Sequence, residues 1–534
     1  MSKISLLDCT LRDGGYINNW KFGKSEIKRI IKHLVKAKIE IIEVGFLSDL
    51  EHDEDCSLYS SVGEIANVCR DKGSSMLAAM IALGEKETNP EKLPLAAEGP
   101  LDIVRITFHR DEEEIEKAEK YARILMEKGY KVCMQPIGTA AYSDDALLSL
   151  VKRINVLSPY AFYLVDTLGS FYNDDLLRLI YLVDHNLNSD IKLGFHSHNN
   201  LQMSFSNAQK VIELHSSREF ILDSSLLGMG RGAGNLCTEL VARYTNSIGA
   251  SNYDMVNILE AIDNCIQPIF LKTPWGYNAH YYMAAIHKCH PNYASYLMDK
   301  HTLTMNQVNL LLQNLPKETR HIFNKELIKA LYNNLQNHSI DDAMALCKLS
   351  KIFEGREILL LAPGRSISTH KAEIKEFINE KNPIIISVNS GFHDFKGDFI
   401  FISNSKRLYG LDYDSFGENI IVTSNLPSLN EKFVSIDYNR LCDNSFSESD
   451  NAGMMLLRLL VLAKVKRAYL AGFDGFSART GDNYYLDKLV GLVSEEDALS
   501  KNASIASQIK KIQAEIEINF LTPSAYSDLV KTNV

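Results

Sequence analysis

The sequence predicts an α/β protein with an N-terminal (β/α)8 barrel, a helical extension and a smaller C-terminal Rossmann-like domain. Between residue 4 and about residue 250, eight apolar strand-like runs alternate with segments of helical period. Each strand-helix unit takes roughly 30 residues, which is the dimension of such a barrel. An open doubly wound sheet is the competing interpretation. A second, shorter strand-helix series begins near residue 356. The expected domains are residues 1–254, 255–350 and 351–534.

The eight expected strands are short and apolar, and most contain β-branched residues. They are Ile4–Cys9, Ile39–Phe46, Ser75–Leu83, Asp102–His109, Lys131–Gly138, Ala161–Leu168, Ile191–His198 and Phe220–Leu227. Between the first two, Ile27, Ile30, Ile31 and Leu34 recur with the spacing of one helical face. Beyond the barrel, residues 255–350 lack strand patterns and are expected to form helices.

Composition narrows the class of protein. A chain of 534 residues needs two or three cores. A net charge of −10 argues against a nucleic-acid partner, and no apolar run reaches the roughly 20 residues of a spanning helix. Nine cysteines occur without a Cys-x-x-Cys pair, and no secretory signal pattern precedes the first strand. We therefore expect a cytoplasmic protein with reduced thiols.

Polar side chains recur where the expected strands end. They are Arg12, Asp13, Glu43, Arg105, His109, Gln135, Asp166, His196 and His198. A polar group in an apolar strand costs free energy unless it is paired or binds something, and barrels bind their ligands at the C-terminal ends of the strands. This convergence predicts an enzyme, although a purely structural ion pair remains an alternative for Arg12 and Asp13.

His196-Ser197-His198 is the strongest indication of a metal site. Residues i and i+2 of a strand share a face, so both imidazoles can reach one cation. A single strand histidine is more often a hydrogen-bonded core residue, but Asp13 supplies a carboxylate at the end of the first strand. Two nitrogens with carboxylate and amide oxygens suit Mn²⁺, Mg²⁺, Co²⁺ or Zn²⁺.

The glycine-rich run from Gly228 to Gly234 ends in Asn235. Alternating glycines can cradle a phosphate, or can form a flexible loop. We favour a close approach of the backbone to the metal pocket, with Asn235 as an oxygen donor.

Four motifs together resemble a known superfamily. They are Asp8-Cys9-Thr10-Leu11-Arg12-Asp13-Gly14, Glu43-Val44-Gly45, His196-Ser197-His198-Asn199 and the glycine-rich loop with Asn235. Over residues 3–290 the chain resembles the DRE-TIM metallolyases (HMGL-like), which include hydroxymethylglutaryl-CoA lyase and isopropylmalate synthase. The stretch Trp275-Gly276-Tyr277 is most similar to the 4-hydroxy-2-oxovalerate aldolases.

The resemblance implies divalent-metal-dependent aldol chemistry on a 2-oxo acid, pyruvate, with an aldehyde. Mn²⁺ or Mg²⁺ would be held by Asp13, His196 and His198, with Asn235 nearby, and Arg12 would stabilise the enolate. The catalytic residues expected are Arg12, Tyr16, Glu43 and His109, and the substrate-binding residues are Arg105, Gln135, Asp166 and Ser170. An acyl-CoA-dependent Claisen-type synthase is the alternative, but we identify no CoA-recognition segment.

One position departs from the aldolase pattern. Where those enzymes carry a histidine thought to be the acid/base, this chain has Tyr16. A phenol with an ordinary pKa near 10 is a poor base at neutral pH. Tyr16, His109 and a metal-bound water are therefore the candidate proton carriers.

The C-terminal series has expected strands at 357–361, 383–388, 399–402, 419–422 and 468–471. Its first glycine turn and a late Gly-Phe-Asp faintly resemble sialyltransferase-like and motility-accessory glycosyltransferase domains. This implies nucleotide-sugar contacts by Gly364, Arg365, Ser366, Asn389 and Asp474, in a pathway making a surface carbohydrate. A purely oligomerising module is the alternative, and we expect a homo-oligomer. The final segment, from Ser494 to Phe520, has helical spacing at Ile505, Ile509, Ile512, Ile516 and Phe520, and we expect a helix that packs on this domain.

Overall fold

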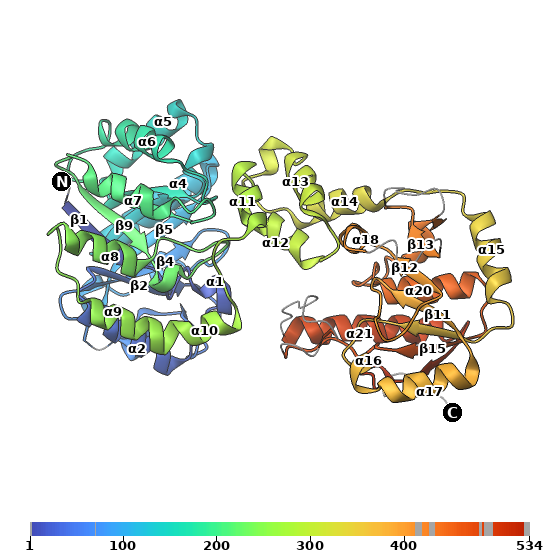
Figure 1. The fold of residues 1–534 in the computed structure, drawn as a ribbon. Helices are drawn as coiled ribbons and strands as arrows, with labels where there is room; N and C mark the ends of the chain where they lie inside the picture. The colour runs from blue at the N-terminus through green and yellow to red at the C-terminus, as the bar shows by residue number, and fades with distance from the viewer. Residues whose placement is uncertain are drawn as a thin grey trace. The chain divides into compact units, whose positions relative to one another are not determined.

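The computed structural model describes residues 3–69, 71–411, 419–426, 433–479, 483–484 and 495–527. It divides into two compact units. Unit 1 comprises residues 1–299 and 308–325, and unit 2 comprises residues 300–307 and 326–534. Figure 1 colours the chain from blue in the barrel to red in the C-terminal sheet. The three-domain boundaries remain a prediction.

Unit 1 contains a closed barrel of eight parallel strands. The strands are β1 (Lys3–Asp8), β2 (Ile41–Leu47), β4 (Met76–Ala82), β5 (Leu101–Phe108), β6 (Lys131–Pro136), β7 (Ala161–Asp166), β8 (Lys192–Ser197) and β9 (Glu219–Ser224). Their order is β1-β9-β8-β7-β6-β5-β4-β2, and β1 pairs with β2, where Leu7 lies opposite Ile41. This pairing confirms the predicted barrel and excludes the open sheet.

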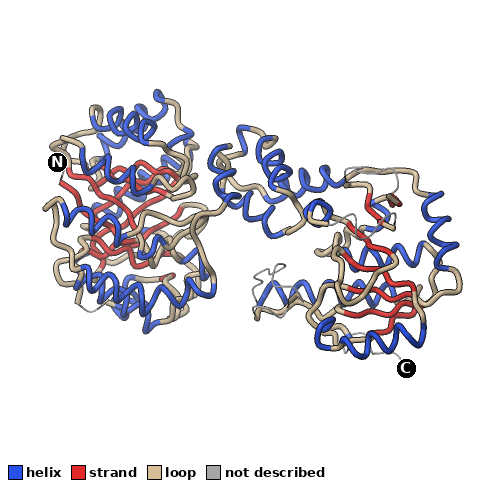
Figure 2. The backbone as a smooth tube through the Cα atoms, in the orientation of Figure 1, coloured by secondary structure: helices blue, strands red, loops and turns tan. Residues whose placement is uncertain are grey.

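Helices surround these strands, as Figure 2 shows in blue around red. They are α2 (Lys24–Lys36), α3 (Val62–Val68), α4 (Glu112–Glu127), α5 (Asp144–Leu157), α6 (Asn173–Asp184), α7 (Ser204–Glu213), α8 (Thr238–Ser247) and α9 (Met255–Ala261). On α2 the predicted apolar face of Ile27, Ile30, Ile31 and Leu34 is buried. A short helix α1 (Gly15–Asn18) follows the first strand, and the two-residue strand β3 (Leu58–Tyr59) adds to β2.

The barrel interior is layered. Leu7, Ile41, Ile103 and Ile221 belong to one buried apolar cluster that lies inside the strands. Two residues further along three of these strands, the same face carries charge at Glu43, Arg105 and Asp223. Because strand residues i and i+2 share a face, an apolar layer therefore supports a charged layer nearer the C-terminal ends of the strands.

Beyond α9, the regular elements up to residue 353 are helical, as expected. The α-helices among them are α10 (Gln267–Lys272), α11 (Ala279–Ile286), α12 (Pro291–Asp299), α13 (Met305–Gln313), α14 (Lys325–Gln336) and α15 (Ala343–Phe353). Within the described ranges, no helix combines the length and apolarity needed to cross a bilayer.

Unit 2 is built on a seven-stranded parallel sheet. Its strands are β10 (Ile358–Leu361), β11 (Ile384–Val388), β12 (Phe399–Ile402), β13 (Ile420–Thr423), β14 (Val434–Ile436), β15 (Arg467–Ala471) and β16 (Glu517–Phe520). The order β14-β13-β12-β11-β10-β15-β16 reverses direction between β10 and β15, which is the switch point of a doubly wound, Rossmann-like sheet. The helices are α16 (Ser366–Thr369), α17 (Lys371–Lys381), α18 (Ser405–Tyr409), α19 (Tyr438–Leu441), α20 (Ala452–Leu462) and α21 (Glu495–Ile512).

The expected helix through Phe520 is wrong at its end. Helix α21 stops at Ile512, and β16 pairs with β15, with Glu517 opposite Arg467 and Phe520 opposite Leu470. Ile516 and Ile518 are both buried in the core of the sheet. Strand pairing, which depends on residues about 50 positions away, overrides the local helical spacing here.

Replacing Leu7 by alanine tests the closed interior. Leu7 is fully buried at the β1–β2 seam, so we expect Leu7→Ala to lower the free energy of unfolding by about 2–5 kcal/mol. Val156→Ala, at a side chain 77% exposed on α5, is the matched control and should change it by less than about 0.5 kcal/mol. Urea denaturation measures both. Equal midpoints for the two variants would contradict the packing described.

Candidate metal centre

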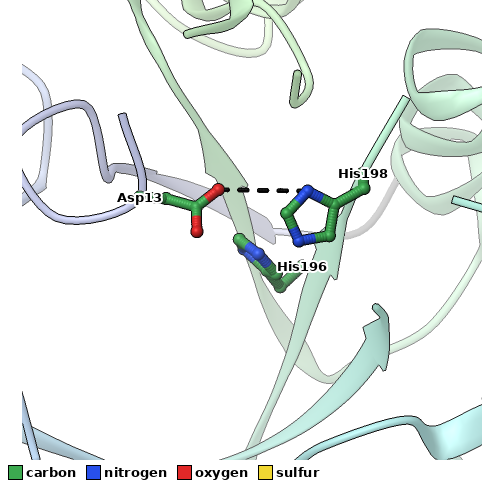
Figure 3. A group of neighbouring side chains, drawn as sticks. All are labelled: Asp13, His196 and His198. Carbon is green, nitrogen blue, oxygen red and sulfur yellow. Dashed lines mark ion pairs between the residues drawn. The ribbon is translucent and has the colours of Figure 1, made fainter. Parts of the chain in front are cut away.

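Asp13, His196 and His198 meet at the C-terminal end of the barrel. Asp13 lies in the turn after β1, His196 lies in β8, and His198 immediately follows that strand. All three are buried, and one candidate ligand atom of each lies within 4.8 Å of the others. Asp13 Oδ2 is 4.0 Å from His198 Nδ1 (Figure 3). The spacing i, i+2 thus directs both imidazoles toward the same carboxylate.

His196 is oriented by a residue that the sequence analysis did not single out. His196 Nδ1 donates to Asp223 Oδ2 of β9 at 2.9 Å, so its Nε2 keeps a lone pair for a ligand. A carboxylate behind an imidazole is the usual arrangement around metal-binding histidines. Asp223 interrupts the apolar run Phe220–Leu227, and the reasoning applied to polar residues in other strands would have identified it.

Burial and charge set the protonation states of the cluster. Burial lowers the pKa of His198 to about 3, although the negative charge of Asp13 acts to raise it. The His198 ring is therefore neutral at pH 7. Burial alone would raise the pKa of Asp13, but the Arg12 guanidinium and the two histidines hold it well below its ordinary value. One carboxylate and two imidazole rings are a suitable donor set for a divalent cation.

A buried charge network supports the cluster; we use this term for Asp13, Arg12, Glu43, Arg105, Asp223 and His196. Arg12 Nη1 donates to Asp13 Oδ1 at 2.7 Å, and its Nε donates to Glu43 Oε2 at 2.8 Å. Arg105 Nη1 donates to the same Glu43 oxygen at 2.8 Å, and Nη2 donates to Asp223. The network therefore connects the carboxylate of the cluster to the carboxylate that orients His196.

Asn235 and the glycine-rich loop lie against Asp13. Asn235 Nδ2 donates to Asp13 Oδ2 at 2.5 Å. A Cβ on Gly230 would lie 2.4 Å from that amide nitrogen and 2.9 Å from Asp13 Oδ2, so no other residue fits there without displacement. The loop thus makes the close approach that the sequence predicted, while the role of Asn235 as a ligand remains a prediction.

The residues present fit a divalent cation. Several buried polar atoms in this region have no hydrogen-bond partner: His198 Nδ1, Asn235 Oδ1, Arg12 Nη2 and Gln135 Oε1. Such atoms are costly unless a ligand or water satisfies them. Two ligand atoms that each lie about 2.1 Å from one ion are at most about 4.2 Å from each other. The three candidate ligand atoms lie within 4.8 Å of one another, so side-chain movements well under about 1 Å bring them around one cation.

The other predicted barrel residues differ in what they contact. Arg105 is fully buried within the charge network, and Gln135 is buried at the end of β6. Asp166 accepts from the Ser170 and Phe171 backbone N–H groups at 2.9 Å, and therefore organises the loop after β7. Substrate binding by Arg105, Gln135, Asp166 and Ser170 remains a prediction.

The two side chains predicted to carry protons, Tyr16 and His109, lie in different surroundings. Tyr16, on α1, has its pKa raised by burial despite the charge of Arg231, so the phenol stays protonated at neutral pH. His109 follows β5, is partly exposed, and has Nδ1 3.1 Å from Glu114 Oε2. Among the described residues, no hydrogen bond joins Tyr16 to His109.

In unit 2, Gly364, Ser366 and Asp474 lie together at the switch point between β10 and β15. Ser366 donates its backbone N–H to Asp474 Oδ2 at 2.7 Å and its hydroxyl also contacts that carboxylate. A Cβ on Gly364, the residue two before it, would lie 2.3 Å from the Gly472 carbonyl oxygen. Asn389, beyond β11, accepts from the Ser403 N–H at 3.3 Å. Nucleotide-sugar contacts by these residues and Arg365 remain a prediction.

The fold and the site define a class: a (β/α)8-barrel protein with an Asp-His-His cluster at the C-terminal face. The HMGL-like family model matches residues 3–264. Oxaloacetate decarboxylase of Mycobacterium tuberculosis is 30% identical over 48% of this chain and 74% of its own length. A 4-hydroxy-2-oxovalerate aldolase of Geobacillus genomosp. 3 is 24% identical over 50% of this chain and 77% of its own.

Among solved structures, the N-terminal domain of a putative aldolase from Bacteroides vulgatus is 28% identical, with a TM-score of 0.49 over 57% of this chain and 98% of that one. The chain belongs to the HMGL-like family of the DRE-TIM superfamily. The predicted superfamily and the prediction of an enzyme are thereby confirmed. The faint C-terminal resemblance remains a prediction.

Asp223→Asn tests the support of His196. The variant loses the charge that accepts from His196 Nδ1, and such outer partners commonly contribute 10- to 100-fold to metal affinity. We expect Mn²⁺ affinity, measured by calorimetry, to fall within about that range. Asp102→Asn, which removes a carboxylate paired with Lys72 near the start of β5, is the control. Unchanged affinity in Asp223→Asn with an intact circular-dichroism spectrum would contradict the assigned role.

Asp8→Asn tests a buried carboxyl beside the site. Burial raises the pKa of Asp8 to about 6, although Thr10 and Thr238 donate to it. Because the folded-state pKa lies above the unfolded value near 3.9, this group contributes stability below about pH 4 that is lost as pH rises through 6. We expect the variant to gain up to about 3 kcal/mol relative to the wild type between pH 4 and 7. Parallel pH–stability curves from urea denaturation would contradict this.

Proposed function

We propose that the barrel catalyses divalent-metal-dependent aldol chemistry through the enolate of a 2-oxo acid, with pyruvate as the preferred one. The observation that carries this proposal is the buried Arg12 Nη2, which has no partner and lies beside the Asp13, His196 and His198 cluster. A guanidinium N–H next to a cation site suits an oxygen on which negative charge develops. The named aldolase and decarboxylase relatives support the same class of reaction.

Asp13, His196 and His198 would hold the cation, with Mn²⁺ or Mg²⁺ favoured and Co²⁺ or Zn²⁺ compatible with the donors. When bound, the cation supplies Lewis acidity to the carbonyl oxygen of the 2-oxo acid. Glu43 accepts from both Arg12 and Arg105 and thereby orients the Arg12 fork. Glu43 is thus a positioning residue in this proposal.

In the cleavage direction the substrate is a 4-hydroxy-2-oxo acid. Its C3–C4 bond breaks, the hydroxyl proton leaves to a base, and the aldehyde carbonyl forms. The electron pair of the broken bond becomes the enolate, whose oxygen accepts from Arg12, and C3 then takes up a proton to give pyruvate. The raised pKa of Tyr16 suits it to hold and return a proton rather than to remove the first one. His109, oriented by Glu114, is the candidate base.

Oxaloacetate decarboxylation is a second candidate, favoured by the relative with 30% identity. It breaks a carbon–carbon bond beside the same carbonyl and leaves the same enolate, with CO₂ in place of the aldehyde. For unit 2 we propose nucleotide-sugar binding at the switch point, in a pathway to a surface carbohydrate. Its support is the Gly364 turn at the end of β10, where doubly wound sheets bind ligands. Cytoplasmic location and a homo-oligomer remain predictions.

Exchange of the pyruvate methyl protons in D₂O with added Mn²⁺ tests enolate formation, because it needs no second substrate. Arg12→Lys keeps the positive charge but loses the guanidinium, whose separate N–H groups donate to Asp13 and to Glu43. We expect the variant to exchange at least about 10²-fold more slowly, by analogy with the loss of an oxyanion donor. NMR integration of the methyl signal measures the rate.

Two controls accompany this test. Asp13→Asn should abolish Mn²⁺-dependent exchange, and Arg178→Met, which removes an exposed arginine paired with Asp144, should leave it unchanged. Wild-type exchange no faster than that of Asp13→Asn would overturn the proposed function.

A further inference from the structure

Arg231 and His290 form a second polar pair at the C-terminal end of the barrel. Arg231 follows Gly230, whose backbone lies against Asp13 and Asn235, and its guanidinium carbon is 5.4 Å from the centroid of the Tyr16 ring. His290 comes from the turn before α12, within unit 1. Its Nε2 lies 3.2 Å from Arg231 Nη1. The helical extension thus brings an imidazole to the neighbourhood of the metal centre.

The hydrogen bonds of this pair are incomplete. The Asn292 N–H donates to His290 Nδ1 at 3.2 Å, which places the ring proton on Nε2, facing a guanidinium that can only donate. A neutral imidazole accepts a hydrogen bond at only one nitrogen, which here is Nδ1. The N–H groups of His290 Nε2 and Arg231 Nη1 therefore face each other with no acceptor between them. Arg231 Nε is also buried without a partner. No ion pair joins Arg231 to a carboxylate in the part of the chain that the structure describes.

Charge balance points the same way. In the network, the carboxylates of Asp13, Glu43 and Asp223 exceed the guanidiniums of Arg12 and Arg105 by one. A divalent cation and the carboxylate of one 2-oxo acid bring the sum to zero. Arg231 then has no counter-charge within the network. Lys86 lies nearby, 5.6 Å from the Tyr16 ring centroid and 4.1 Å from that of Trp20, and the charge of Glu85 acts on it.

We infer that Arg231 and His290 bind an anionic group, a carboxylate or a phosphate, on the aldehyde partner of the reaction. An anionic oxygen accepts from Arg231 Nη1 and His290 Nε2 together, and charge-assisted bonds of this kind are the strong ones. This inference rests on the proposed function and adds the acceptor class: an aldehyde with an anionic tail. The carboxylate that is lost as CO₂ in a decarboxylation does not suit the place beside Arg231. The guanidinium would stabilise the negative charge on that carboxylate, and decarboxylation must remove this charge.

The test compares three aldehydes in condensation with pyruvate: succinic semialdehyde, glyceraldehyde 3-phosphate and neutral butanal. We expect the wild type to favour at least one anionic aldehyde over butanal by about tenfold or more in kcat/KM. Arg231→Met should reduce this ratio by about 10- to 100-fold, the range for a lost hydrogen bond to a charged group. Because the readout is a ratio, general effects on the chemistry cancel. The better anionic aldehyde identifies the carboxylate or the phosphate.

Conservative variants and a matched control sharpen the test. Gln can present an N–H near the position of His290 Nε2, so His290→Gln should keep more of the anionic preference than His290→Ala. Arg178→Met, on the outer surface at α6, should keep all of it. Calorimetric binding of succinate and of inorganic phosphate to the metal-free protein gives a readout without turnover, and Arg231→Met should weaken the binding seen in the wild type.

The possible failures are distinguishable. Pyruvate proton exchange with equal kcat/KM for the three aldehydes, or an unaltered ratio in Arg231→Met, overturns this inference and leaves the proposed function standing. Wild-type protein without proton exchange overturns both.

Discussion

The buried charge network is the constraint on which the rest of the site depends. Isolated charges inside a barrel cost several kcal/mol each, and removing one partner of a buried pair commonly costs about 3–5 kcal/mol. Here the guanidiniums of Arg12 and Arg105 alternate with the carboxylates of Asp13, Glu43 and Asp223. Apart from the Arg12–Asp13 pair within one turn, the ion pairs of the network join residues of different strand units, as in Arg12–Glu43, Arg105–Glu43 and Arg105–Asp223. The network therefore needs the closed barrel.

The position of this layer explains why the site is polar without destabilising the fold. Ile41, Ile103 and Ile221 form the apolar layer beneath it, and the charged residues follow two positions later on the same strands. The ion pairs of the network are internal, and four of its buried polar atoms have no hydrogen-bond partner: Arg12 Nη2, Arg105 Nε, Glu43 Oε1 and Asp223 Oδ1. Of these atoms, Arg12 Nη2 is the one that the proposed enolate chemistry uses.

Contributions from outside the barrel complete the C-terminal face. The Trp275 indole N–H donates to the Leu227 carbonyl oxygen at 2.9 Å, which ties the segment after α10 to the glycine-rich loop. His290 reaches Arg231 from the turn before α12. The first part of the helical extension therefore contributes side chains to the C-terminal face of the barrel, and in the proposed reaction His290 would help to select the acceptor.

Local pattern determined much of this protein. Alternating apolar runs specified the eight strands, the i, i+2 spacing of His196 and His198 placed both rings on one face, and Gly230 marked a close backbone approach. These features depend on residues adjacent in sequence. Tertiary structure alone decided the closure of β1 on β2, the pairing of β16 with β15, and the partners within the charge network. Those partners lie 31, 62 and 118 residues apart, and no local periodicity specifies which charge meets which. The choice is made when the strands close, because each buried charge is stable only beside its opposite.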